Sequence, residues 1–253
     1  MTNVSDERRT SFDRNAALYD AVRPGYHPGV LDVLRTHVAG TRVLEVGAGP
    51  GKATELLARG GFTVTAVEPG AHLCDLLRAK QLPNVTVVNT RFEDFGGTGF
   101  DVVLAAQAWH WMPERRFELA AAAAPALAIL YNEKAPIDPS LRAELDAAYA
   151  RHFPPDSPRR NPSQVGQTRA EYVQMIEASG LYAAPHVAEL AWTERYTTAR
   201  YLELLSTYSD HAVLAPDARV ALLAEIGAAI DRRGGTIDIP YVTLVFVAHR
   251  LGG

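Results

Sequence analysis

The sequence predicts an α/β protein built on a doubly wound, seven-stranded, mostly parallel sheet with inserted cap helices. Between residues 41 and 131, short runs rich in Val, Ile and Leu alternate with amphipathic stretches. The short runs are almost continuously apolar, which is typical of parallel strands covered by helices on both faces. A glycine-rich turn at residues 47–51 separates the first strand from the first helix, where folds of this class bind ligands.

Size and composition restrict the function. The chain has 253 residues, 47% of them hydrophobic and 21% charged, so it can bury a sizeable core. A formal charge of -4, with no basic run, argues against a nucleic-acid partner. The polar N-terminus does not resemble a signal peptide, and the longest apolar stretch, residues 119–131, is too short to span a bilayer. We therefore expect a cytoplasmic protein with no membrane partner, and we make no prediction of its oligomeric state.

A metal centre is not expected. The single cysteine, Cys74, excludes an internal disulfide, and we expect it to be a buried thiol. The eight histidines lack the spacing of metal ligands.

The elements of the first half follow one another as alternating strands and helices. Residues 10–39 are predicted to be helical, with an interruption at the turn signal Arg23-Pro24-Gly25. The predicted strands are residues 42–46, 63–67, 85–89, 101–105 and 126–131, and the predicted helices are residues 52–58, 72–80 and 113–123.

The second half is predicted to complete the same sheet. A helix at residues 169–179 has a capping box from Thr168 to Glu171 and ends at Gly180. Another helix is expected at about residues 217–232, and alternating apolar residues predict strands at 187–192 and 241–248. We therefore expect one domain over residues 1–253, made of an N-terminal helical lid (1–40), a ligand-binding core (41–131) and a part that completes the sheet and caps the substrate (132–253).

The glycine turn lies in the segment VLEVGAGPGKAT, residues 43–54. The dinucleotide pattern Gly-x-Gly-x-x-Gly requires glycine where this chain has Lys52, so NAD or FAD fits poorly. A phosphate-binding P-loop fails at two positions, which are Val46 and Ala53. The acidic Glu45, two residues before the first glycine, suits a ligand with an ammonium and a sulfonium group better than a pyrophosphate.

These residues resemble the motifs of class I methyltransferases that depend on S-adenosylmethionine (SAM). The strand ending in EVGAGPG is similar to the first motif, Glu68-Pro69-Gly70 to the second, RFEDF to the segment that contacts adenine, and FDVVLAAQAWHWM to the fourth motif. The resemblance implies SAM as cofactor, S-adenosylhomocysteine as its product, and Glu68 as the acceptor of both ribose hydroxyls. The cofactor-binding residues that it implies are Tyr19, Arg23, Glu45, Gly47, Ala48, Gly49, Glu68, Pro69, Phe92, Glu93, Gln107, Ala108 and Trp109.

Within this family, the segments FDRNAALYDAVRPGYHP and AQAWHW resemble a bacterial group that includes trans-aconitate methyltransferase-like proteins. The resemblance implies that Tyr19 and Arg23 close over the cofactor and that Arg23 pairs with its carboxylate. Arg23 as a solvated surface charge is the alternative. The chain departs from this group because AAAAPALAIL replaces the Pro-Gly-Gly turn that often precedes the fifth strand. This departure leaves the glycine turn intact and concerns only the start of the fifth strand.

The chemistry implied by the resemblance is an in-line displacement, in which positioning supplies most of the catalysis. A hydroxyl acceptor also requires a base. We predict that His110 is that base and that Trp109 or Trp111 walls the acceptor pocket, with core packing as the alternative. The predicted substrate contacts are Tyr26, Trp109, His110, Trp111 and Tyr208.

The expected function is therefore methyl transfer from SAM to a small molecule, with a hydroxyl or carboxylate oxygen as the expected acceptor. The alternative is a protein of the same fold that binds SAM and does not methylate, since a fold does not fix a function. A nicotinamide-dependent dehydrogenase is disfavoured by Lys52 and by the lack of an obvious hydride-transfer site.

Overall fold

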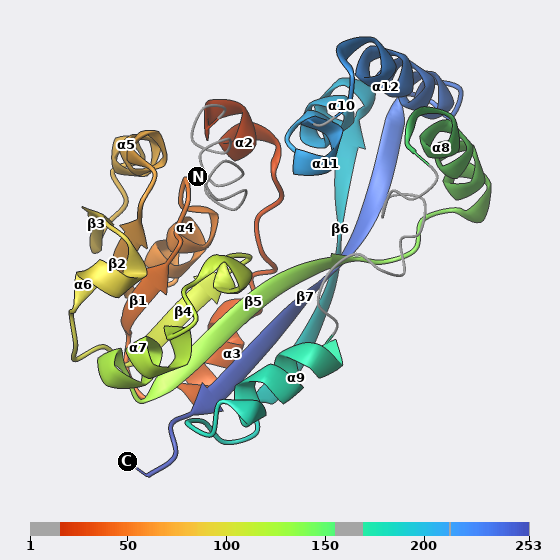
Figure 1. Ribbon diagram of the computed structural model, residues 1–253. Coiled ribbons are helices and arrows are strands. Elements are labelled where there is room, and N and C mark those ends of the chain that lie inside the picture. Colours follow the sequence, from red (N-terminus) through yellow and green to blue (C-terminus); the bar gives the residue numbers. More distant parts are fainter. Residues whose placement is uncertain (1–15, 155–168, 213, 253) are drawn as a thin grey trace. The chain divides into compact units, whose positions relative to one another are not determined.

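The computed structural model describes residues 16–154, 169–212 and 214–252, and its seven strands form one sheet of order β3-β2-β1-β4-β5-β7-β6 (Figure 1). This confirms the predicted α/β fold. The strands are β1 (Arg42–Val46), β2 (Thr63–Glu68), β3 (Val85–Asn89), β4 (Val102–Ala106), β5 (Ala126–Lys134), β6 (His186–Thr197) and β7 (Thr236–His249).

The helices lie between these strands in the order expected of a doubly wound protein. They are α2 (Ala16–Val22), α3 (Val30–His37), α4 (Lys52–Arg59), α5 (Ala71–Ala79), α6 (Phe92–Phe95), α7 (Arg116–Ala123), α8 (Pro139–His152), α9 (Arg169–Ala178), α10 (Thr198–Ser206), α11 (Ser209–Ala212) and α12 (Pro216–Asp231). A short 3₁₀ helix, η1 (Trp109–Trp111), follows β4. Among the described residues, no helix has both the length and the apolar character needed to cross a membrane.

The sheet is mostly parallel. Strands β1 to β5 pair in parallel with their neighbours. Strand β7 runs antiparallel to β5, because Ala135 donates its N–H to the carbonyl of Pro240 at one end and Arg250 donates to that of Pro125 at the other. Strand β6 is also antiparallel to β7. Before β6, Ala183 donates its N–H to the carbonyl of His249, and after β6, Thr198 donates to that of Gly235.

The described residues fall into two compact units. Unit 1 takes its residues from Met1–Arg23, Lys134–Gln167 and Thr193–Tyr241, and unit 2 takes them from Pro24–Glu133, Thr168–Trp192 and Val242–Gly253. Strands β5, β6 and β7 contribute residues to both. The segment expected to bind the ligand, residues 41–131, lies wholly in unit 2.

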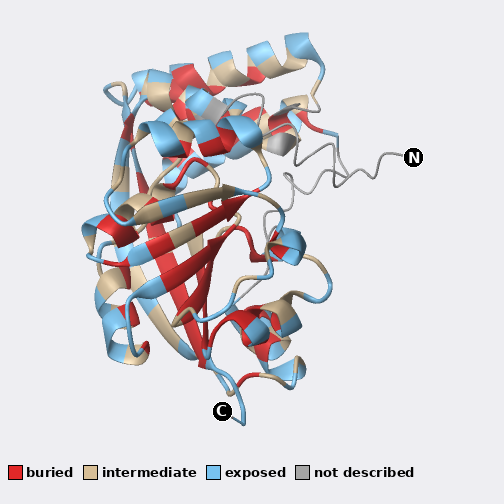
Figure 2. Ribbon diagram, turned by 90° about the vertical axis from the view of Figure 1, so that its left-hand side faces the viewer, coloured by how far each residue is buried: buried red, intermediate tan, exposed pale blue. Residues whose placement is uncertain are grey.

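In unit 2 the central strands, such as β1 and β4, are buried on both faces (Figure 2). In β4, Val102 and Leu104 pack in a cluster that also takes residues from α3, α4 and α5. The alternate residues Val103 and Ala105 pack on the other face with α6, α7 and α9. Because successive strand residues point to opposite faces, this two-sided burial explains the continuous apolar runs in the sequence.

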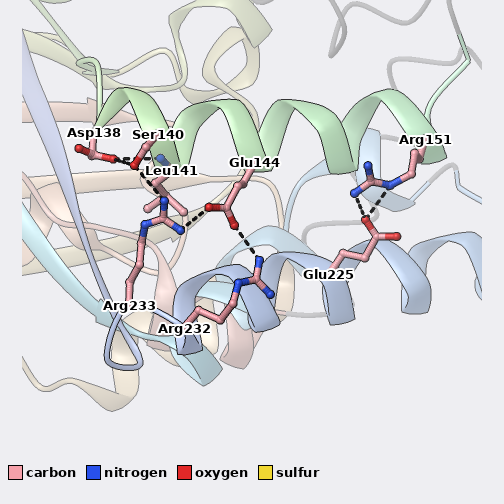
Figure 3. Close-up of polar contacts among 8 residues, drawn as sticks. All are labelled: Asp138, Ser140, Leu141, Glu144, Arg151, Glu225, Arg232 and Arg233. Atoms are coloured by element: carbon pink, nitrogen blue, oxygen red, sulfur yellow. Dashed lines mark hydrogen bonds and ion pairs between the residues drawn. The ribbon is translucent and has the colours of Figure 1, made fainter.

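In unit 1, α8 and α12 are joined by ion pairs (Figure 3). Glu144 accepts hydrogen bonds from Arg232 at 2.7 Å and Arg233 at 2.6 Å, and Arg151 pairs with Glu225. These side chains are partly exposed, so the pairs add little to stability and chiefly fix the register of the two helices.

Helix α8 was not predicted, although the signal for its start is present in the sequence. Asp138 caps the helix by accepting the N–H of Leu141 at 2.9 Å, and Pro139 occupies the first helical position. Strand β7 also begins earlier than predicted, since it continues through Pro240 to Thr236. Thr168, the predicted cap of α9, lies outside the described residues.

Candidate functional site

The glycine turn connects the end of β1 to the start of α4 in unit 2. Gly47, Gly49 and Gly51 have φ angles of 68°, 57° and 90°, in the left-handed region that favours glycine. The N–H groups of Gly47 and Ala48 donate to the carbonyl of Val67 at 2.9 Å and 3.2 Å. The turn is thereby attached to the carboxyl end of β2, at the edge where parallel sheets bind ligands.

The three glycines differ in what surrounds them. A Cβ on Gly47 would lie 2.7 Å from that of Ala108, and one on Gly51 would lie 2.2 Å from Cδ1 of Leu77. A Cβ on Gly49 would have no atom within 4 Å. Gly47 and Gly51 are therefore required by packing, whereas Gly49 borders open space that a ligand can fill.

We expect Gly51→Ala to destabilise the protein more than Gly49→Ala. Both substitutions place a side chain at a left-handed φ, which costs roughly 1–2 kcal/mol. Gly51→Ala adds an overlap with Leu77, for which overpacking costs about 1–3 kcal/mol more. Urea unfolding measures the difference, and equal losses in the two variants would contradict this account of the turn.

Glu68, at the end of β2, holds the glycine turn through its carboxylate. The side chain is buried, and its Oε2 accepts the N–H of Gly49 at 2.9 Å while Oε1 accepts the N–H of Gly70 at 2.8 Å. The two bonds hold the carboxylate, which is an acceptor, at the edge of the glycine turn.

The backbone around Glu68 is fixed by two residues to which the sequence analysis gave no part in the site. Asn89, the last residue of β3, donates through Nδ2 to the carbonyls of Glu68 at 2.9 Å and Pro69 at 3.0 Å. Cys74 is buried as expected, and its thiol lies 3.2 Å from the same Glu68 carbonyl. An asparagine at the carboxyl end of a strand was the available signal for the first of these contacts.

Glu45 on β1 is buried and faces α4. The hydroxyl of Thr54 donates to its Oε2 at 2.6 Å. Desolvation raises the pKa of Glu45 to about 8, with a contribution from the nearby Glu68 carboxylate, although the Thr54 hydrogen bond acts in the opposite direction. Without a ligand, the carboxyl group of Glu45 is therefore protonated in most molecules at neutral pH.

The end of β4 carries an unusual backbone conformation. Gln107 has a φ of 56°, which costs of order 1–3 kcal/mol for a residue other than glycine and is common at functional sites. Its N–H donates to the carbonyl of Leu130 at 2.9 Å, and its Nε2 donates to the carbonyl of Asn132 at 3.1 Å. Ala108 is buried next to Gly47, so β4 and the glycine turn are in direct contact.

The η1 helix contains both tryptophans proposed as pocket walls, and their environments differ. Trp109 is 1% exposed and packs edge-on against Phe117, with ring centroids 5.1 Å apart, which is the core-packing alternative. Trp111 is 37% exposed and its ring lies 4.8 Å from that of His110. His110 is itself exposed, and desolvation by neighbouring groups lowers its pKa from the ordinary value of 6.5, which favours the neutral imidazole at pH 7.

Three further residues predicted to bind the cofactor lie after β2 and β3. Pro69 is exposed, directly after Glu68. Phe92 begins α6 and is buried in the core, whereas Glu93 is exposed and pairs with Arg91 at 3.9 Å.

The remaining predicted residues lie in or before the first helices. Within unit 1, Arg23 donates to the hydroxyl and the carbonyl of Thr207, both at 2.9 Å, and its Cζ lies 4.4 Å from the ring centroid of Tyr208. The structure therefore brings together Arg23 and Tyr208. Tyr19 lies in α2, but its side chain is outside the described part of the chain. Tyr26 belongs to unit 2, where it packs against the cluster that contains α3.

Comparison with known proteins identifies the core of unit 2. Residues 43–128 match the family described as Methyltransferase domain. An uncharacterized methyltransferase of Mycobacterium tuberculosis is 38% identical over 117 residues, which are 46% of this chain and 48% of the relative. Residues 43–128 are a class I methyltransferase domain. The chain spans about half the length of the curated relatives that it matches.

Solved structures share the fold of this chain. A putative type II methyltransferase from Anaeromyxobacter dehalogenans has a TM-score of 0.63 and 25% identity, over 90% of this chain and 97% of that one. A phosphoethanolamine N-methyltransferase from Haemonchus contortus with S-adenosylhomocysteine has a TM-score of 0.52 and 15% identity, over 98% and 60%. The cyclase SpnF has a TM-score of 0.56 and 15% identity, over 99% and 98%. The last two show the fold alone, and the likeness to trans-aconitate methyltransferases stays a prediction.

Proposed function

We propose that the chain binds SAM at the carboxyl ends of β1, β2 and β4 and transfers its methyl group to a small molecule. The observation that carries this proposal is the turn at Gly49, which borders open space and is held by the buried carboxylate of Glu68. A ligand lying over Gly49 is adjacent to an anion that can accept the hydroxyls of its sugar. Bound SAM supplies an activated methyl group on a sulfonium.

Each predicted residue is assigned a part in this proposed site. Glu68, held beside the turn by the N–H groups of Gly49 and Gly70, accepts the ribose hydroxyls. Gly47, Ala48 and Gly49 follow the methionine end of the ligand, and the buried Glu45 faces its ammonium group. Gln107 and Ala108 complete this edge at β4, and Pro69, Phe92 and Glu93 border the adenine. The part of Tyr19 and Arg23 in holding the carboxylate rests on the resemblance alone.

The acceptor is proposed to be a hydroxyl or a carboxylate. A hydroxyl oxygen forms its bond to the methyl carbon as the carbon–sulfur bond breaks and the electron pair goes to sulfur. His110 takes the proton on its neutral imidazole, and Tyr26, Trp111 and Tyr208 contact the acceptor. The side chain of Trp109 belongs to the core, so we propose that its backbone borders the cofactor.

A second candidate is a protein that binds SAM without methyl transfer. We keep this second candidate because the chain shares its fold with the cyclase SpnF, which is named for a different reaction.

Incubation of the chain with methyl-labelled SAM and a pool of hydroxyl- and carboxylate-bearing metabolites tests the proposal. We expect S-adenosylhomocysteine to form only when an acceptor is present, with one label transferred per product. Binding of SAM without transfer to any acceptor would favour the second candidate. An absence of SAM binding would contradict both.

We expect His110→Gln to lower kcat by about 10²-fold or more with little change in the KM for SAM, because it removes the proposed base. The lowered pKa of His110 places the acid limb of the wild-type kcat/KM profile for the acceptor below pH 6.5, since activity is lost as the imidazole becomes protonated. Steady-state rates at saturating SAM measure both effects. A His110→Gln enzyme with wild-type kcat would exclude the base.

A further inference from the structure

A polar junction lies beside the end of β4 in unit 2. It joins five segments that are far apart in the sequence, through Gly25, His27, Gln107, Asn132, Trp192 and Thr243. Thr243 at its centre is 0% exposed, whereas the other buried residues of β7 are hydrophobic. A buried hydroxyl in such a strand calls for a reason, because valine fills nearly the same volume without polar atoms.

The direction of every hydrogen bond at Thr243 is fixed. Its Oγ1 lies 3.0 Å from Nε1 of Trp192 and 3.4 Å from the backbone nitrogen of His27, and both of these groups only donate. The hydroxyl proton therefore points to its third partner, Oδ1 of Asn132, at 2.6 Å.

This contact in turn fixes the amide of Asn132. Since Oδ1 accepts from Thr243, Nδ2 faces the carbonyl of Gly25, to which it donates at 2.8 Å. The backbone carbonyl of the same asparagine accepts Nε2 of Gln107 at 3.1 Å. Asn132 therefore connects the segment before α3 to the left-handed residue at the end of β4.

The junction holds the residues on both sides of Tyr26. Gly25 is attached through its carbonyl and His27 through its N–H, and Gly29 donates its N–H to Nδ1 of His27 at 3.0 Å. With both neighbours held, the backbone of Tyr26 cannot shift without breaking one of these bonds. Strand and helix hydrogen bonds do not supply this order, because residues 23–29 belong to no strand or helix.

We propose that Asn132 and Thr243 are positioning residues that set the places of Tyr26 and Gln107 at the cofactor edge. The inference rests on the proposed function, in which Gln107 borders SAM and Tyr26 borders the acceptor. Asn132 contacts Gln107 through its backbone carbonyl and Gly25, next to Tyr26, through its side-chain amide. A change in the position of Asn132 therefore loosens two separate parts of the site. Neither asparagine nor threonine touches the reacting atoms in this account.

Thr243→Val and Thr243→Ser form a matched pair for the test. Valine keeps the volume and removes the hydroxyl, whereas serine keeps the hydroxyl. We expect hydrogen exchange at the amide of His27 to rise at least about tenfold in Thr243→Val and to stay within about threefold of wild type in Thr243→Ser. The affinity for S-adenosylhomocysteine, measured by calorimetry, should fall about tenfold in the valine variant only, because fewer molecules hold the competent arrangement.

Asn132→Asp supplies an independent variant of almost the same shape. Its carboxylate still accepts from Thr243 but no longer donates to Gly25, so we expect faster exchange at residues 25–27 with exchange in β3 unchanged. Wild-type exchange and affinity in both Thr243→Val and Asn132→Asp would overturn the proposal, and so would faster exchange with unchanged affinity. If the wild-type chain itself bound no S-adenosylhomocysteine, the proposed function would fail, while the exchange comparison would still decide whether the junction orders residues 25–27.

Discussion

Replacing Glu68 by glutamine should lower the affinity for S-adenosylhomocysteine by about 100-fold or more. Hydrogen bonds to a charged group contribute about 1.5–3 kcal/mol each, and the carboxylate is proposed to accept two ribose hydroxyls. The glutamine NH2 also meets the N–H of Gly49 or of Gly70, both of which only donate, so the turn itself loses a partner. Calorimetric titration of both proteins measures the change.

Glu55→Gln is the matched control for this substitution. Glu55 lies on α4, close in sequence to the turn, and its carboxylate pairs with Arg59 at 2.7 Å and Lys80 at 3.6 Å. We expect the control to bind S-adenosylhomocysteine as the wild type does. A Glu68→Gln protein with affinity within threefold of wild type would remove Glu68 from the cofactor site.

Glu45→Gln should stabilise the free protein at neutral pH and leave its stability at pH 5 nearly unchanged. The pKa of Glu45 is raised to about 8 from its ordinary 4.5. Between these two values the unfolded chain releases a proton that the folded protein retains, so the stability of the wild type falls as the pH rises. Glutamine does not titrate, and its gain should reach on the order of 3 kcal/mol at pH 7.

Urea unfolding at pH 5, 7 and 8 measures this gain. Glu144→Gln is the control with the opposite sign, since hydrogen bonds from Arg232 and Arg233 lower the pKa of Glu144. A depressed carboxylate stabilises the fold above its unfolded pKa and loses that contribution as the pH falls, so this control should gain nothing at pH 8. A gain in Glu45→Gln that did not depend on pH would show that Glu45 is ionised in the free protein.

The destabilising burial of Glu45 has a functional explanation in this account. Keeping Glu45 protonated at neutral pH costs stability in the free protein, and the ammonium group of SAM, bound as proposed, would give the ionised carboxylate a partner. Residues at binding sites often reduce stability in this way, because selection acts on function above a stability threshold.

The core of the fold was predictable because its signals are local. Strands β1 and β3 have the predicted bounds, since each is a short apolar run that ends at a glycine turn or at a polar residue. Strands β6 and β7 extend much further than predicted. Their extra residues include Arg195 and Asp238, which pair with each other at 2.6 Å across the two strands and look like loop residues in the sequence.

The glycine turn was predictable for the same reason. Gly47, Gly49 and Glu68 lie at or shortly after the ends of strands, so their spacing alone marks them. Asn132 and Thr243 are 111 residues apart in the chain, and no local pattern predicts a hydrogen bond between them. The burial of Trp109 was equally unpredictable, because an aromatic residue after a strand packs inward or lines a pocket according to tertiary contacts alone.

Calorimetric titration of the wild-type chain with SAM, S-adenosylhomocysteine and NAD tests the central claim most directly. The arrangement of Gly49 and Glu68 predicts saturable binding of SAM and of S-adenosylhomocysteine at one site per chain, and no binding of NAD. Heat with NAD alone, or with none of the three ligands, would contradict a SAM site at the carboxyl edge of this sheet.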